Sequence, residues 1–189
     1  MLDHELIESG TTHTLEVLNN FPNLENSMIV VKKFFNNEIL KQLLEFCEST
    51  DEWQDAYDTA GQVIKNRKKI SWKLDSILEV SHVILENITP QMSKIFNKDL
   101  KFNGVDLWKD MPGYTISKHT DNPEFNASLQ IYIKNLPYLS TVFEHNGITV
   151  TDPNPGNGYL ADNTVGIPHW LNGIVPENYE RFSLHATWS

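Results

Sequence analysis

Residues 114–123 read YTISKHTDNP, and this stretch decides the predicted fold. Apolar and polar side chains alternate through its first four residues, which predicts a β-strand, and the Asn-Pro pair predicts the end of that strand. Side chains two residues apart on a strand share one face of it. We therefore expect the imidazole of His119 and the carboxylate of Asp121 to reach one metal ion together.

A second group of candidate ligands lies near the C-terminus. His169 follows the His-x-Asp pair, and an Arg-x-Ser sequence, Arg181 and Ser183, follows His169. Two histidines and one carboxylate, with coordination positions left open, form the facial triad of non-haem Fe(II) oxygenases. A lone arginine on a late strand suits a cosubstrate carboxylate, because its planar fork donates two parallel hydrogen bonds.

From residue 102 onward, the apolar residues recur with a period of two, and Gly, Pro and Asn turn signals separate the short runs. Eight strands are predicted, over residues 102–108, 114–119, 127–133, 141–144, 149–151, 158–161, 174–175 and 180–188. Eight such strands suit a double-sheet jelly roll of the kind found in cupins.

The first half of the chain predicts support for this sheet. Residues 28–31 predict a short strand, and Asn36 is a candidate N-cap for a helix that runs to about residue 49. A second helical pattern spans residues 74–96, where Pro90 is expected to kink or divide the helix.

Two segments carry weaker patterns. Residues 1–27 predict a partly ordered arm, with an edge strand over residues 12–17. We interpret residues 53–58, which are aromatic and acidic without a clear period, as a connecting loop, with a place on the rim above the metal as the alternative.

The chain of 189 residues is most simply one domain, large enough to bury about 70% of its unfolded surface. We divide it into the arm, a helical support over residues 28–101, and a jelly-roll core over residues 102–189. The predicted fold class is α+β, mainly β, with supporting N-terminal helices.

The net charge of −10 and the isoelectric point near 5.1 disfavour binding to nucleic acid. We interpret the one basic run, residues 65–69, as a solvated loop. The single cysteine, Cys47, has apolar neighbours and is expected to be a buried structural thiol. With no apolar leader and no apolar run of membrane length, the sequence predicts a cytoplasmic or other reducing compartment.

The ordered pattern of His-x-Asp, distal His and Arg-x-Ser resembles the Fe(II)/2-oxoglutarate-dependent dioxygenase superfamily, and within it the small prolyl-hydroxylase-like branch. The resemblance covers roughly residues 102–189 and implies a double-stranded β-helix. It implies that His119, Asp121 and His169 bind Fe(II), and that 2-oxoglutarate and O2 take the open positions. The implied oxidoreductase hydroxylates a C–H bond, with a peptidyl proline as the finer expectation, and releases succinate and CO2; ascorbate is a further candidate cofactor.

The chain departs from the family pattern in three places. The middle strand, residues 141–144, is not preceded by the glycines that the family often carries, and the interval from His169 to Arg181 is slightly longer than the commonest one. The last strand has an arginine where animal-collagen-type prolyl hydroxylases place a lysine. The nucleic-acid demethylase branch carries another arginine six residues further on, where this chain has Thr187.

The resemblance also directs attention to a 2-oxoglutarate pocket. We expect Arg181 to anchor the far carboxylate of the cosubstrate and Ser183, on the same strand face, to add a donor. Tyr132 is the candidate for a third donor, with Tyr114 as its substitute, although a core role for Tyr132 is equally open. Trp108 and Tyr114 are further candidates for the pocket wall. The other five histidines are left out of the site: His4, His13, His82, His145 and His185.

Two other classes of function remain open. In the first, a cupin-like module binds a metal or a small acid without oxidising anything. In the second, the same ligands hold zinc in a hydrolase, which is weakened by the lack of an evident general base and leaves Arg181 unexplained. For the oxygenase, the substrate is a peptide, a protein or a small metabolite, and the carboxylate ligand Asp121 argues for hydroxylation over halogenation.

Overall fold

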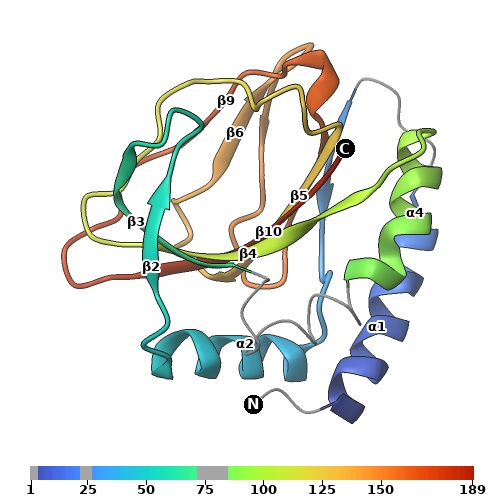
Figure 1. The fold of residues 1–189 in the computed structure, drawn as a ribbon, viewed down its shortest axis with the longest axis horizontal. Helices are drawn as coiled ribbons and strands as arrows, with labels where there is room; N and C mark the ends of the chain where they lie inside the picture. The colour runs from blue at the N-terminus through green and yellow to red at the C-terminus, as the bar shows by residue number, and fades with distance from the viewer. Residues whose placement is uncertain (1–3, 22–26, 72–84) are drawn as a thin grey trace.

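The computed structural model describes residues 4–21, 27–71 and 85–189 and contains two antiparallel β-sheets (Figure 1). The larger sheet has seven strands in the order β1-β8-β5-β10-β4-β3-β2, and the smaller has three in the order β7-β6-β9. The strands are β1 (Met28–Val31), β2 (Gln54–Tyr57), β3 (Val63–Ser71), β4 (Phe102–Asp110), β5 (Ala127–Lys134), β6 (Thr141–Glu144), β7 (Ile148–Val150), β8 (Gly158–Asp162), β9 (His169–Leu171) and β10 (Arg181–Trp188). A short 3-10 helix, η2 (Asn163–Val165), follows β8. The predicted mainly-β fold with supporting helices is confirmed.

Three helices pack on one face of the larger sheet: α1 (His4–Asn19), α2 (Asn37–Ser49) and α4 (Asn87–Phe96) (Figure 1). The main hydrophobic core lies between this face and the helices. Every second residue of the central strands enters it, for example Leu129 and Ile131 of β5 and Leu184 of β10. The remaining residues of these strands therefore point to the opposite face.

The three-stranded sheet covers that opposite face. Phe143 of β6 packs edge-on against Tyr159 of β8, with ring centroids 4.8 Å apart. Seven of the eight residues of β5 are buried, because the helices cover one side of the strand and the small sheet covers the other. Polar side chains on the inner face must then find partners inside the protein.

Both predicted helices are present in the part of the chain that the structure describes, as α2 and α4. Asn36 caps α2, and its side chain accepts a hydrogen bond from the backbone N–H of Ile39. Pro90 lies inside α4, and residues 85–86, just before α4, are in a π-helical conformation, so the helix is irregular next to the proline. Residues 74–84 of the second helical pattern, with His82, lie outside the described residues. Cys47 is buried, as expected, and burial raises the pKa of its thiol to about 12.

The edge strand predicted over residues 12–17 is wrong, because this segment belongs to α1. Thr14 and Leu18 are fully buried on one face of the helix, and the hydroxyl of Thr14 donates to the carbonyl of Phe34. At Gly10, an added Cβ would collide with the side chain of Ile39, so α1 and α2 are in close contact there. A helix face that includes threonines does not give a clear apolar period.

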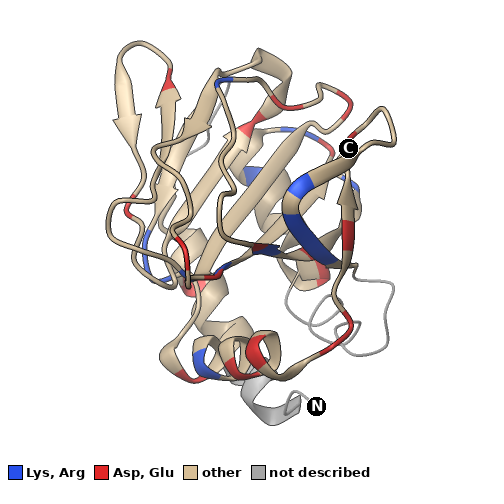
Figure 2. Ribbon diagram, turned by 90° about the vertical axis from the view of Figure 1, so that its left-hand side faces the viewer, with Lys and Arg blue, Asp and Glu red and all other residues tan. Residues whose placement is uncertain are grey.

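The loops predicted over residues 53–58 and 65–69 are also corrected. Residues 54–57 form β2, and the basic run lies on β3, where it appears as a blue stretch of ribbon in Figure 2. The two strands pair with each other, and β3 continues the large sheet beside β4. Sheet pairing, which the local sequence does not encode, makes them strands.

Two of the eight predicted strands, residues 114–119 and 174–175, are not strands in the structure, and residues 169–171 form β9 instead. The two segments do run side by side, with backbone hydrogen bonds from Val175 to Tyr114 and from Leu171 to Ile116. Gly173, with a φ of 126°, turns the backbone between these contacts, so no continuous ladder forms. None of the described helices is long and apolar enough to cross a membrane.

Candidate metal centre

The two histidines of the predicted triad lie side by side because their backbones pair. His119 and His169 exchange two hydrogen bonds, with N···O distances of 3.0 and 2.8 Å, in an isolated antiparallel bridge. This bridge places the two imidazole centroids 4.3 Å apart. Residues that are distant in the sequence thus face one site.

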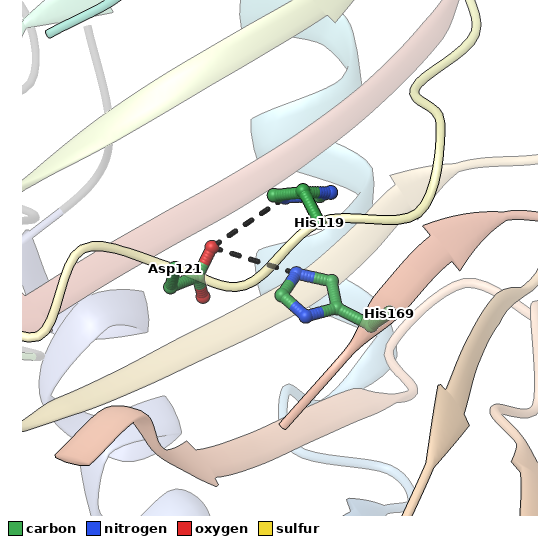
Figure 3. A group of neighbouring side chains, drawn as sticks. All are labelled: His119, Asp121 and His169. Carbon is green, nitrogen blue, oxygen red and sulfur yellow. Dashed lines mark ion pairs between the residues drawn. The ribbon is translucent and has the colours of Figure 1, made fainter. Parts of the chain in front are cut away.

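The carboxylate of Asp121 faces both imidazoles from one side (Figure 3). Its Oδ1 is 3.7 Å from Nε2 of His119 and 3.4 Å from Nε2 of His169. One ligand atom from each residue lies within 4.8 Å of the other two. Two ligand atoms at right angles, each about 2.1 Å from an ion, are about 3 Å apart. The three residues are therefore close to the spacing of a facial triad.

The second nitrogen of each imidazole fixes the orientation of the ring. Nδ1 of His119 is 2.9 Å from the carbonyl of Ser117, and Nδ1 of His169 is 3.0 Å from the carbonyl of Ile167. Because a carbonyl oxygen only accepts, each Nδ1 must carry a proton and donate it. The lone pair of each neutral ring is then on Nε2, which faces the site. This donor set suits a divalent transition-metal ion.

The protonation of the site is coupled to its geometry. Burial would raise the pKa of the Asp121 carboxyl, but hydrogen bonds from His119 and His169 outweigh burial and hold it well below its ordinary value. The hydrogen bond to Asp121 raises the pKa of His119 above its ordinary value, against the opposing effect of burial. A ligand imidazole must lose its proton to bind a cation, so a metal ion competes with protons here.

A cavity opens beside the triad, between the two sheets. His169 and Leu171 of β9 line one side of it, and Trp108, Gln130 and Arg181 of the large sheet line the other. The cavity continues into a groove of about 650 Å³ between the β2–β3 hairpin and residues 119–125. The triad thus lies where the cavity meets the open groove.

Arg181 is one of the residues that line the cavity. Its side chain is 2% exposed, and its Nη1 donates to Oδ2 of Asp110, the residue opposite it on β4. Its Nε is buried and has no hydrogen-bond partner among the described residues. The expected anchor is therefore at the cavity, but it is already paired with an acid.

Ser183 and Tyr132, the other two predicted donors, are not among the residues that line the cavity. The hydroxyl of Ser183 accepts from Nε2 of Gln130 at 3.1 Å. The hydroxyl of Tyr132 is 2.9 Å from that of Thr141 and 2.8 Å from that of Thr151, so both of its neighbours are protein groups. The structure does not bring either residue to the cavity wall.

Tyr114 and Trp108 do line the cavity. The hydroxyl of Tyr114 is buried without a partner among the described residues, which is unusual for a buried polar group. Burial raises the pKa of Tyr114 to about 12, so the phenol keeps its proton and can donate it at neutral pH. Trp108 stacks on His185, with centroids 4.2 Å apart, and burial lowers the pKa of His185 to about 4.

Several further cavity or supporting residues were not predicted from the sequence, and among them is His185, which was left out of the site but lines the cavity. Arg67 lines the cavity, and Asp110 pairs with it. Gln130 and Tyr159 also line the cavity, and the hydroxyl of Tyr159 donates to Oε1 of Gln130 at 2.6 Å. The sequence could have indicated Asp110, because it lies two residues after Trp108 and therefore on the same face of β4. Arg67 gives no such signal, because basic residues surround it in the sequence.

No protein-family model matches the chain, and the comparison with curated proteins also gave no match. Solved structures with the same fold are 2-oxoglutarate/Fe(II) oxygenases, several of them prolyl hydroxylases.

Three of these structures cover nearly the whole chain. A prolyl hydroxylase from Trichoplax adhaerens, in complex with a peptide fragment of the hypoxia inducible factor oxygen degradation domain, aligns over 100% of this chain and 94% of its own, with a TM-score of 0.68 and 12% identity. A prolyl-4-hydroxylase from Pseudomonas putida aligns over 94% and 98%, with a TM-score of 0.68 and 14% identity. HygX from Streptomyces hygroscopicus, with nickel and 2-oxoglutarate bound, aligns over 94% and 86%, with a TM-score of 0.61 and 8% identity.

The chain therefore has the double-stranded β-helix of the 2-oxoglutarate/Fe(II) oxygenases. It also brings His119, Asp121 and His169 together at one candidate metal centre. Fold and triad together are consistent with a 2-oxoglutarate-dependent dioxygenase.

We predict that the affinity for a divalent metal falls as the pH is lowered. The raised pKa of His119 keeps its imidazole protonated to a higher pH than that of an ordinary histidine, and the protonated ring cannot bind a cation. Calorimetric titration with Fe(II) under anaerobic conditions, from about pH 8 down to about pH 6, measures the dependence.

Asp121→Asn should weaken metal binding at least about tenfold, because it removes the charged ligand. His145→Gln, at the turn after β6, should keep the wild-type affinity and pH profile. An affinity that does not change with pH, or equal effects of the two variants, would contradict this account of the site.

Proposed function

We propose that the protein is a 2-oxoglutarate-dependent oxygenase that hydroxylates a C–H bond. One observation carries the proposal: a triad of two imidazoles and one carboxylate adjoins a cavity that is lined by a buried arginine and a buried, unpartnered phenol. The fold shared with oxygenases of this class supports it. A module that only binds metal has no need of the arginine and the phenol at the same cavity.

In this proposal, His119, Asp121 and His169 hold Fe(II). The bound iron and 2-oxoglutarate would supply the oxidising chemistry, in which O2 converts 2-oxoglutarate to succinate and CO2 as the substrate is hydroxylated. The protein places the ligands, excludes water and holds the target carbon near the metal. The backbone bridge between the two histidines and the Nδ1 hydrogen bonds preorganise the ligand atoms.

We assign the cosubstrate to the cavity beside the triad. Arg181 binds the carboxylate that is remote from the metal, and the phenol of Tyr114 donates a hydrogen bond to the cosubstrate. Tyr114 takes the role that the sequence suggested for Tyr132, whose hydroxyl is bound by two threonines. Ser183 acts indirectly in this proposal, by holding the side chain of Gln130 at the cavity.

The open groove is the proposed route for the substrate. It contains aromatic and apolar side chains such as Tyr57, Phe125 and Trp108, and its Lys69 and Asp106 are paired with each other at 3.4 Å. Asp58 adds a further carboxylate to the lining, so the groove favours an uncharged segment of substrate over a polyanion. A peptidyl proline, in a peptide or protein, is the first substrate to test, and small neutral metabolites are the second.

Turnover of 2-oxoglutarate tests the proposal directly. With Fe(II), O2 and ascorbate, the wild-type protein should produce succinate and CO2, slowly without substrate and faster with one, because the cosubstrate can be oxidised in an uncoupled reaction. Asp121→Ala should abolish the product, since the metal loses a ligand. If the iron-loaded wild type forms no succinate with any candidate peptide or metabolite, the proposed activity is wrong.

Two tyrosine-to-phenylalanine variants test the assignment of the donor. Tyr114→Phe should weaken 2-oxoglutarate binding roughly 2- to 10-fold, the effect of one neutral hydrogen bond of about 0.5–1.5 kcal/mol. Tyr132→Phe should leave the affinity unchanged and lower the free energy of unfolding by about 1–3 kcal/mol, because Thr141 and Thr151 lose a buried partner. Calorimetry measures the affinity for 2-oxoglutarate, and urea unfolding measures the free energy of unfolding. If only Tyr132→Phe weakened binding, Tyr132 and not Tyr114 would be the donor.

A further inference from the structure

A second arginine reaches the cavity beside the triad from β3. Arg67 is 7% exposed and lines the cavity together with Arg181. Its guanidinium carbon lies 4.1 Å from the ring centroid of Trp108 and 4.1 Å from that of Tyr114. The guanidinium is therefore stacked between two aromatic faces, which fix its plane and exclude water from it.

Asp110 connects the two arginines. Nε and Nη2 of Arg67 donate to Oδ1 and Oδ2 of Asp110 at 2.6 and 3.1 Å, and Nη1 of Arg181 donates to the same Oδ2. Asp110 lies opposite Arg67 in the β3–β4 pairing and opposite Arg181 in the β4–β10 pairing. The three charges thus form a row across three neighbouring strands, which we call the Arg67–Asp110–Arg181 row.

The row carries one more positive charge than negative. Asp110 alone would neutralise Arg181, so Arg67 is the residue that keeps this end of the cavity positive. Asp121 is the one carboxylate among the described residues that line the cavity, and it is engaged by the two histidines. An uncompensated charge in a buried site is costly, and a bound anion removes that cost.

The charge count also fits the cosubstrate. A divalent ion at the triad, with Asp121 as its one charged ligand, leaves one positive charge at the metal end. The row leaves one positive charge at the other end. A dicarboxylate that places one carboxylate at each end matches both charges, whereas a monocarboxylic 2-oxo acid leaves the row unmatched.

We propose that Arg67 and Arg181 together bind the far carboxylate of 2-oxoglutarate, and that Asp110 is a positioning residue that holds the two guanidiniums for it. This inference rests on the proposed function and adds a residue outside the Arg-x-Ser pattern. Arg67 is then what makes the cavity select a dicarboxylic 2-oxo acid over a monocarboxylic one.

The test compares two ligands of equal chain length. Anaerobic calorimetry on the Fe(II)-loaded protein gives the dissociation constants of 2-oxoglutarate and of 2-oxopentanoate, which lacks the far carboxylate. The ratio of the two constants measures the discrimination. A merely structural role of Arg67 would weaken both ligands together and leave this ratio unchanged.

Arg67→Met should reduce the discrimination at least tenfold, because Asp110 then neutralises Arg181 and repels the incoming carboxylate. Adding Asp110→Asn to this variant should restore much of it, because Arg181 is released. Lys65→Met, an exposed position on the same strand, should leave the ratio at its wild-type value. Thermal unfolding of each variant checks that the fold is retained.

An unchanged ratio in Arg67→Met, or no restoration by Asp110→Asn, would overturn the inference. If Arg67→Met does not fold, Asp110→Asn alone decides the matter. The amide oxygen still accepts a hydrogen bond from a guanidinium while the negative charge is gone, so the discrimination should rise, and a lower value would overturn the inference. A wild-type protein that binds neither ligand contradicts the proposed function instead, so the two failures are distinguishable.

Discussion

The central strands β5 and β10 are buried on both faces along most of their length, and this constraint organises the rest of the molecule. One face needs apolar side chains to pack against α1, α2 and α4. The other face lies under the small sheet, where every polar group needs a partner in the protein or in a ligand. Because successive side chains of a strand point to opposite faces, the alternation in these strands meets both demands. It places Gln130, Arg181 and His185 on the inner face.

The two ends of the cavity are built by different means. The metal end depends on a single backbone bridge, which brings His119 beside His169 although the flanking segments do not form a continuous ladder. The other end depends on regular pairing, because the register of β3, β4 and β10 places Arg67, Asp110 and Arg181 in one row. A slip of one residue in that register would turn the charges to the helical face.

The sequence predicted the fold class, the capping of α2 by Asn36 and most of the strands of the second half, because each has a local cause in alternation or turn chemistry. The triad was predicted from the order of His119, Asp121 and His169, and the structure brings these residues together. The helix α1, the strands β2 and β3 and the cavity role of Arg67 were missed. Their conformations follow from packing and pairing with distant segments, which a local pattern does not record. The hydroxyl of Tyr132 illustrates the same limit, since only the fold reveals its threonine partners.

The most direct test of the account is the visible absorption spectrum of the anaerobic protein with Fe(II) and 2-oxoglutarate. If the two histidines and Asp121 hold iron and leave adjacent positions open to the cavity, a metal-to-ligand charge-transfer band should develop on addition of 2-oxoglutarate and be absent in His119→Ala. A wild-type protein that binds Fe(II) but develops no band at saturating 2-oxoglutarate would contradict the account.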